Sequence, residues 1–199
     1  NRFIYFKREW VPEEVNYYRF FKLIPKSWIR KIPQPKNLRE ISFSIPPDKI
    51  VDYLPEKTKM FPSHIVDNEI AQKIPGTGVS YSFTDETDYY NDLRSSKFGI
   101  TTKRAGWDCL RHYEIAANAT VICFKNLHEK PPTCAPHGLI DGKNCISYTN
   151  YNNLMEKINS LYAGQYEELQ QQSLAWVKSK TTGEVARQFI NTFFPGWSL

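Results

Sequence analysis

The sequence lacks any run of 18 apolar residues, and its N-terminus does not have the pattern of a signal peptide. Because a membrane-spanning helix needs about 20 apolar residues, the chain is not expected to cross a membrane. Internal repeats and low-complexity tracts are also absent. These absences exclude transmembrane and repeat architectures and favour an ordinary globular fold.

Cysteine is scarce, and dense positive charge is missing. The four cysteines have no close metal-binding spacing, so no metal site is expected (Cys109, Cys123, Cys134, Cys145). We interpret them as reduced thiols, which predicts a cytoplasmic protein. The net charge of +5 is mild. It suits a phosphorylated ligand, whereas a nucleic-acid partner normally requires a dense basic stripe.

What the sequence does contain is a large apolar and aromatic fraction. The 199 residues are 41% apolar and 15% aromatic, enough for one large domain or one and a half. Eight of the 13 prolines fall within residues 25–75. We therefore divide the chain into a proline- and aromatic-rich segment, 1–75, that packs on or completes a sheet, and a domain, 76–199. Because residue 1 is Asn rather than Met, the sequence is expected to be a piece of a longer chain.

Short β-favouring runs alternate with helical patterns along the chain. This alternation predicts an α/β fold with a Rossmann-like parallel sheet and flanking helices. The predicted strands are residues 1–6, 38–45, 79–83, 98–102, 120–124 and 144–148. The predicted helices are residues 13–23, a short helix capped by Ser63, 85–96, 107–117, 153–161 capped by Thr149 or Asn150, 165–178 and 184–194.

Residues 97–124 form the unit around which the rest is organised: a strand, a basic loop, a helix and a strand. Residues 120–124 are apolar without alternation, as expected of a strand buried on both faces. The loop holds Lys103, Arg104 and Gly106 and leads into a helix at Trp107. A helix start exposes unpaired N–H groups, and glycine permits close approach of a ligand. The pattern indicates a phosphate site, with a solvated basic turn as the alternative.

Glu114 lies on the same predicted helix, within a largely apolar stretch. At ~1.5 Å per residue it stands ~10 Å from Trp107, a suitable distance for a carboxylate that binds ribose hydroxyls while phosphates lie at the helix start. A carboxylate in such surroundings is usually paired or functional. The alternative is an ion pair with Arg111 on a solvent face.

Several segments resemble the donor-binding half of GT-B glycosyltransferases, and the exostosin-like and CgeB-like members most of all. They are residues 93–100, 106–107, 111–117 and 121–122, followed by 139–148 and 151–161, in the expected order. The resemblance spans residues 79–194. It implies a transferase that is metal-independent and needs no cofactor. Such an enzyme moves a sugar from a nucleoside diphosphate sugar to an acceptor hydroxyl.

By position, the resemblance makes Glu114 the ribose-binding glutamate and places the diphosphate against Lys103, Arg104, Gly106 and Trp107. Two residues depart from the pattern. Gly106 replaces a glutamate that contacts the sugar in many retaining members, and Asn118 replaces a glycine and is expected to adopt its left-handed conformation. In this fold the segment after the preceding strand faces the base, so Tyr81 or Phe83 is a candidate for stacking on it.

Two of the four histidines, His112 and His137, are candidates for a catalytic role. His112 is two residues from Glu114 and points away from it on a helix, which favours a surface or interface role. His137 lies in a loop after a strand, where it is expected either to contact sugar or pyrophosphate or to order the loop. The resemblance also implies that a general base would come from an N-terminal half, and since two complete Rossmann domains need more than 199 residues, that half is expected to lie outside this chain. The second hypothesis for the whole chain is a non-catalytic module that binds a nucleotide or a glycan.

Overall fold

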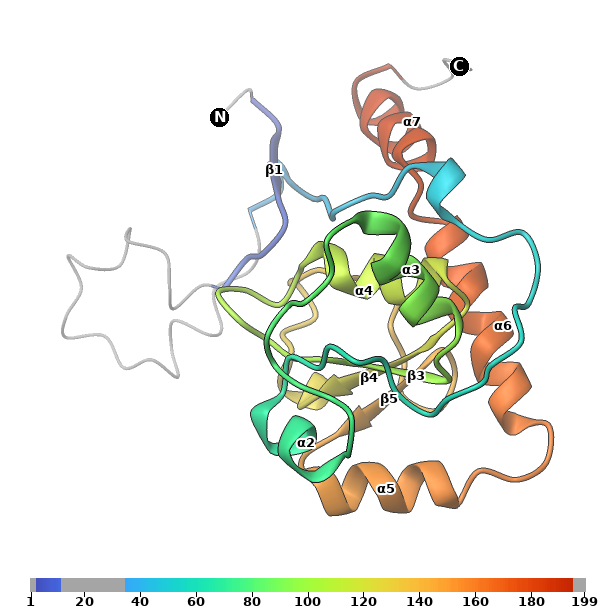
Figure 1. Cartoon of the computed structure of the whole chain (residues 1–199). Coiled ribbons are helices and arrows are strands. Elements are labelled where there is room, and N and C mark those ends of the chain that lie inside the picture. Colours follow the sequence, from blue (N-terminus) through green and yellow to red (C-terminus); the bar gives the residue numbers. More distant parts are fainter. Residues whose placement is uncertain (1–2, 12–34, 195–199) are drawn as a thin grey trace, which may run out of the picture.

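The computed structural model describes residues 3–11 and 35–194, and the helix predicted at 13–23 lies outside them. Its centre is a parallel three-stranded sheet in the order β3–β4–β5 (Figure 1). The strands are β3 (Phe98–Thr101), β4 (Val121–Lys125) and β5 (Cys145–Tyr148). Phe98 pairs with Val121, and Ile122 with Cys145. The predicted parallel α/β layer is therefore confirmed.

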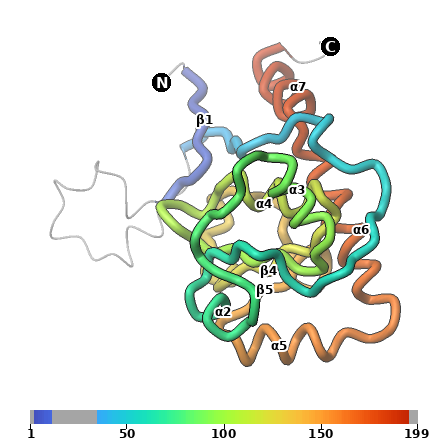
Figure 2. Tube along the Cα trace, viewed as in Figure 1, coloured from blue at the N-terminus to red at the C-terminus, as the bar shows by residue number. Residues whose placement is uncertain are grey.

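Helices cover both faces of this sheet. On one face, Ile122 and Phe124 of β4 pack with residues of α4 (Leu110–Ala117) and α6 (Gln165–Lys178). On the other face, Val121 and Cys123 pack with residues of α2 (Asn68–Lys73) and α5 (Tyr151–Asn159). The tube view shows α4 and α5 on opposite sides of the sheet (Figure 2). Because all four of these β4 side chains are fully buried, β4 needs no polar alternation.

Side chains cap the N-termini of several helices. Asp85 caps α3 (Glu86–Arg94), Asn150 caps α5, and Thr181 caps α7 (Thr182–Phe193), each by accepting a backbone N–H. A second parallel pair, β1 (Tyr5–Lys7) with β2 (Leu38–Glu40), lies beside α7 (Figure 1). The short 3₁₀ helices η3 (Pro47–Lys49) and η4 (Leu127–Glu129) complete the described chain. In that part, no helix is both long and apolar enough to cross a membrane.

The strand predicted at 79–83 is wrong. A strand needs a partner edge, and the start of β3 is already bonded to an earlier segment. Lys97 N donates to Lys59 O and Phe98 N to Met60 O, both at 2.9 Å. Residues 79–83 instead run as an irregular segment whose Tyr81 is 55% exposed.

Three local predictions are also corrected. Asp67, not Ser63, caps α2, because the Ser63 side chain and N–H both bond to Asp92. The helix predicted from Trp107 begins at Leu110. The left-handed residue after α4 is Ala119, at φ 50°, while Asn118 stays at φ −94° and donates through Nδ2 to Glu114 O.

Gly99 sets how closely α4 approaches β3. A Cβ at this position would stand 2.6 Å from Cγ2 and 2.9 Å from Cγ1 of Ile115, a stiff β-branched side chain that is 1% exposed. We expect Gly99→Ala to lower the free energy of unfolding by about 2 kcal/mol through overpacking. Chemical denaturation measures this loss. Gly78→Ala is the control, since a Cβ there meets nothing within 4 Å.

Trimming the opposing side chain tests the cause of that loss. Ile115→Ala opens space and is itself destabilising, but adding Gly99→Ala to it is expected to cost almost nothing further. Full additivity of the two changes would show that Gly99 is needed for another reason.

Candidate functional site

The loop between β3 and α4 carries the predicted phosphate-binding residues. Lys103 and Arg104 are exposed, and Arg104 N donates to Gly106 O at 3.2 Å to form a tight turn. The Lys103 amine lies 5.1 Å from the centre of the Trp107 ring. Trp107 is 5% exposed and its ring packs on Phe124, so its side chain belongs to the core and not to the surface of the loop.

A carboxylate of the chain itself occupies the N–H groups at the end of this turn. Oε1 of Glu9 accepts hydrogen bonds from Trp107 N at 2.6 Å and from Asp108 N at 3.0 Å. A Cβ on residue 106 would stand 2.9 Å from Glu9 Cδ and closer still to Oε1. The absence of a side chain at Gly106 is therefore what admits Glu9. Glu9 thus supplies a carboxylate beside position 106, where Gly106 itself has no side chain.

Backbone pairing holds Glu9 in this place. A single antiparallel bridge joins Glu9 to Cys134. Trp10 N donates to Thr133 O at 3.2 Å, and Ala135 N donates to Arg8 O at 2.8 Å. Glu9 lies 98 residues before Trp107, and nothing in the local sequence signals the contact.

Glu114 faces an open pocket of about 390 Å³ between α3 and α4. Its Oε2 accepts a hydrogen bond from the Tyr89 hydroxyl at 3.0 Å, and burial raises the pKa of its carboxyl group. Within the described residues no ion pair joins it to Arg111, although both side chains line the pocket. The pocket is lined by Tyr81, Phe83, Thr84, Asp85, Glu86, Tyr89, Arg111 and Glu114.

Aromatic rings form one wall of the Glu114 pocket. The ring of Tyr81 lies 5.3 Å from Phe83 and 5.7 Å from Tyr89, centre to centre. The sequence placed Tyr81 or Phe83 near a base and Glu114 at a ribose. The structure brings all three to one pocket, and an exposed aromatic face such as that of Tyr81 accepts a stacked base.

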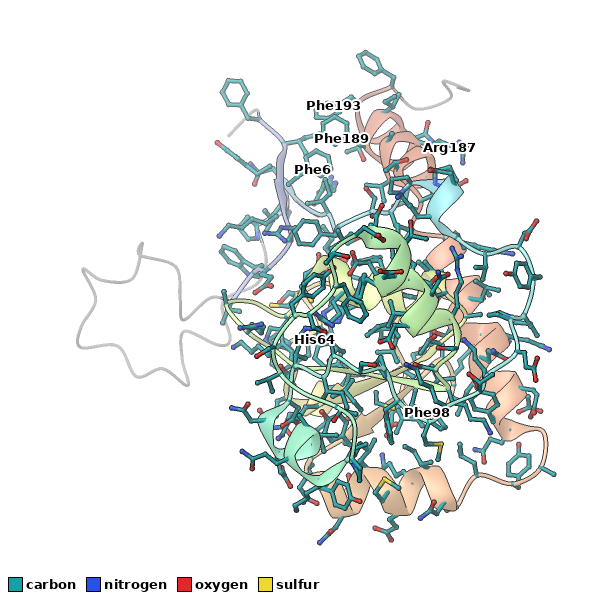
Figure 3. The ribbon with its side chains drawn as sticks, in the orientation of Figure 1. Phe6, His64, Phe98, Arg187, Phe189 and Phe193 are labelled. Atoms are coloured by element: carbon teal, nitrogen blue, oxygen red, sulfur yellow. The ribbon has the colours of Figure 1, made fainter. Side chains whose placement is uncertain are left out.

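His64 was missed by the sequence analysis. Its ring lies 5.5 Å from Tyr81, and burial together with the positive charges of Arg111 and Arg104 lowers its pKa. Its Nδ1 is buried and has no hydrogen-bond partner among residues 3–11 and 35–194. Figure 3 places His64 near the middle of the molecule. The positive charges of Arg111 and Arg104 thus affect His64, which packs against Tyr81 of the aromatic wall. No local sequence motif predicts this arrangement.

His112 does not have the surface or interface role that the sequence analysis favoured. It is fully buried and stacks on Phe124, with ring centres 4.7 Å apart. Its Nε2 bonds the Trp107 carbonyl at 2.9 Å, which makes Nε2 the protonated nitrogen, while Nδ1 lies 3.0 Å from Thr101 Oγ1. Burial lowers its pKa to about 4. His112 is therefore a neutral core residue that ties the loop to β3.

His137 lines a different pocket, and none of its neighbours there lines the Glu114 pocket. Its Nδ1 lies 3.6 Å from Glu40 Oε2. The structure thus brings Arg111 to the Glu114 pocket and keeps His137 apart. Among the described residues no cluster of His, Cys, Asp or Glu is arranged to hold a metal ion.

No family model and no curated protein matches this chain. Among solved structures it resembles sucrose-phosphate synthase from Thermosynechococcus elongatus, with a TM-score of 0.54 and 14% identity over 92% of this chain and 56% of that chain. It also resembles a GtfA/B complex, with a TM-score of 0.54 and 14% identity over 88% of this chain and 43% of that chain.

The chain therefore spans about half the length of these two structures. At such identities the likeness concerns the fold, which is the parallel α/β layer of GT-B glycosyltransferases, as the sequence predicted. The exostosin-like and CgeB-like subgroup stays a prediction.

Proposed function

We propose that this chain provides the donor-binding part of a glycosyltransferase that transfers a sugar from a nucleoside diphosphate to an acceptor hydroxyl. The observation that carries the proposal is the Glu114 pocket. The partly buried carboxylate of Glu114 and an aromatic wall meet there beside Arg111. These are the groups that a nucleoside diphosphate requires.

The nucleoside fits the pocket as follows. Among the described residues, Tyr89 is the only hydrogen-bond donor to the side-chain carboxylate of Glu114, which leaves carboxylate lone pairs for the two ribose hydroxyls. The exposed ring of Tyr81 offers a stacking face for the base. Burial raises the pKa of Glu114 because it disfavours the charged carboxylate. Ribose hydroxyls that donate hydrogen bonds to this carboxylate would stabilise its charged form, and this is expected to favour binding.

The diphosphate would lie against the cations at the start of α4. Lys103 and Arg104 are exposed on the loop, and Arg111 lies in the first turn of the helix. Fixed positive charge at this position would stabilise the leaving diphosphate during transfer. The N–H groups of Trp107 and Asp108 would join them only after Glu9 moves aside.

Ligand titration tests this proposal. UDP, GDP and their sugars are added separately, and the stability of the chain is followed by thermal unfolding. A nucleotide present at 100 times its Kd should add ~2.7 kcal/mol to the free energy of unfolding. A melting curve that no nucleoside diphosphate shifts would contradict donor binding.

Glu114→Gln removes the ribose-binding charge while preserving shape. We expect it to weaken nucleotide binding by roughly 10- to 100-fold, because hydrogen bonds to a charged group contribute ~1.5–3 kcal/mol. Isothermal titration calorimetry with UDP measures the loss. The matched control is Glu86→Gln, which changes a carboxylate that lines the same pocket but is paired with Lys49. Loss of folding in Glu114→Gln, with binding intact in residual folded protein, would assign Glu114 a structural role.

One observation favours the second hypothesis, a nucleotide- or glycan-binding module without turnover. The N–H groups of Trp107 and Asp108, which our proposal places nearest to the donor phosphates, already bind Glu9, and a site without turnover could keep this contact. Release of UDP from a UDP-sugar, followed by a coupled assay, separates the two functions. Turnover by this chain, alone or with an added N-terminal partner domain, would exclude the binding-only module.

A further inference from the structure

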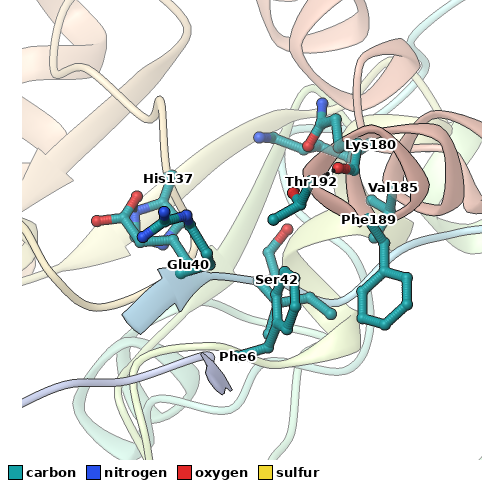
Figure 4. Close-up of a pocket in the computed structure, with 11 residues that line it drawn as sticks. Phe6, Glu40, Ser42, His137, Lys180, Val185, Phe189 and Thr192 are labelled. Atoms are coloured by element: carbon teal, nitrogen blue, oxygen red, sulfur yellow. Dashed lines mark hydrogen bonds and ion pairs between the residues drawn. The ribbon is translucent and has the colours of Figure 1, made fainter. Parts of the chain in front are cut away.

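A second pocket, of about 240 Å³, lies between the β1–β2 pair and α7, apart from the Glu114 pocket. Figure 4 shows His137 and Glu40 on one side of it and Lys180 with Thr192 on the other. The pocket is lined by Phe6, Arg39, Glu40, Ile41, Ser42, His137, Lys180, Val185, Gln188, Phe189 and Thr192. Neither the fold nor the proposed donor site assigns it a role.

Positive groups outnumber negative ones around this pocket. Arg39 and Lys180 line it together with the imidazole of His137, against the single lining carboxylate of Glu40. Burial lowers the pKa of both Lys180 and His137, while the negative charges of Asp108 and Glu40 oppose the shift. An added anion would favour the charged forms of both side chains, so the pocket gains most from a negatively charged occupant.

The imidazole of His137 has an unused hydrogen-bonding atom. Its Nε2 is buried and has no partner within the described residues. Trp176 Nε1 donates to the His137 carbonyl at 2.9 Å, which fixes the residue in place. A buried polar atom without a partner costs roughly 1–3 kcal/mol, and a ligand oxygen that reached Nε2 would recover that cost.

Aromatic side chains form the outer wall. The rings of Phe6 and Phe189 lie 4.6 Å apart, and Phe193 joins them at 5.2 Å from Phe189 (Figure 3). Phe189 is 42% exposed although it stands on the wall of the pocket. The volume of about 240 Å³ lies below the ~300–1,000 Å³ of most pockets for drug-sized ligands, so the occupant is expected to be a small molecule.

From these features together we infer that the pocket between β2, His137 and α7 binds a small sugar acid or sugar phosphate. Its anionic group would lie against Lys180, Arg39 and His137. One apolar ring face would lie on Phe6 and Phe189. The hydroxyls of Ser42 and Thr192 and the amide of Gln188 supply further hydrogen-bonding groups for a sugar. This site is independent of the proposed donor site.

Calorimetric titration with glucuronate, glucose 6-phosphate, inorganic phosphate and glucose tests the inference. We expect one of the two charged sugars to bind at least 10-fold more tightly than both glucose and inorganic phosphate, and which of the two does so distinguishes a carboxylate from a phosphate ligand. Equal binding of glucose and the charged sugars, or no binding of any probe, would overturn the inference.

Variants localise the binding. Lys180→Met and Arg39→Gln are each expected to reduce affinity for the charged sugar at least 10-fold, whereas Lys178→Met, a change at an exposed position at the end of α6, should leave it unchanged. Arg39→Gln keeps the test valid if Lys180→Met does not fold. Unchanged affinity in a folded variant of either residue would overturn the inference. Because UDP binding should not respond to these variants, a failure here is distinct from a failure of the donor site.

Discussion

Glu9→Ala is expected to lower the free energy of unfolding by about 3 kcal/mol, a large effect for a side chain near the start of the described chain. The Glu9 carboxylate accepts two backbone hydrogen bonds, from Trp107 N and Asp108 N. A hydrogen bond to a charged group contributes ~1.5–3 kcal/mol, and partial solvent exposure of Glu9 keeps the sum below the upper limit. Urea unfolding of the variant and the wild type measures the difference.

Gly106→Ala provides an independent route to the same contact. The added Cβ would overlap Glu9 and push its carboxylate away from the two N–H groups. We expect a loss similar to that of Glu9→Ala, and almost no further loss when the two changes are combined. Gly78→Ala is the control, because its Cβ would meet nothing within 4 Å. Additive losses would mean that Gly106 and Glu9 act separately.

The same variants connect stability to the proposed donor site. Once Glu9 is removed, the Trp107 and Asp108 N–H groups become available to a diphosphate. UDP is therefore expected to bind Glu9→Ala more tightly than it binds the wild type, while a nucleoside without phosphates binds both equally. Tighter nucleoside binding would show instead that the variant has altered the Glu114 pocket.

Acidification from pH 6.5 to 4 is expected to reduce stability by about 3 kcal/mol through His112 alone. The pKa of His112 is about 4 in the folded chain and 6.5 in the unfolded chain. Between these two pH values His112 is protonated in the unfolded chain but stays neutral in the folded chain. The stability contributed by the neutral ring is thus present above pH 6.5 and is lost as the pH falls, at ~1.36 kcal/mol per unit.

The comparison with His112→Gln isolates this effect from other titrating groups. The variant is expected to be less stable at neutral pH, because it loses packing on Phe124, yet to have a flatter dependence on pH between 6.5 and 4. Denaturant midpoints at several pH values give both quantities. His128→Gln, which replaces an exposed ring, is the control and should follow the wild type. A parallel pH dependence in wild type and His112→Gln would show that His112 does not resist protonation.

Local sequence determined the parallel sheet and most of its helices. The apolar runs at β3 and β4 have no alternation because both faces are covered, and the caps at Asp85 and Asn150 act through neighbours three residues away. The position of Glu114 on α4 also follows from helical spacing. Such features depend on interactions within one element, which a sequence pattern records directly.

Tertiary structure alone decided which distant groups meet. Glu9 accepts hydrogen bonds from the backbone N–H groups of Trp107 and Asp108. Together with burial, the positive charges of Arg111 and Arg104 lower the pKa of His64. His137 joins Glu40 and Lys180 at a separate pocket. The segment 79–83 has β-favouring residues but forms no strand, and residues 59–60 bond instead to the start of β3. Each of these contacts joins segments that lie far apart in the sequence. Neither segment alone therefore carries a pattern that predicts the contact.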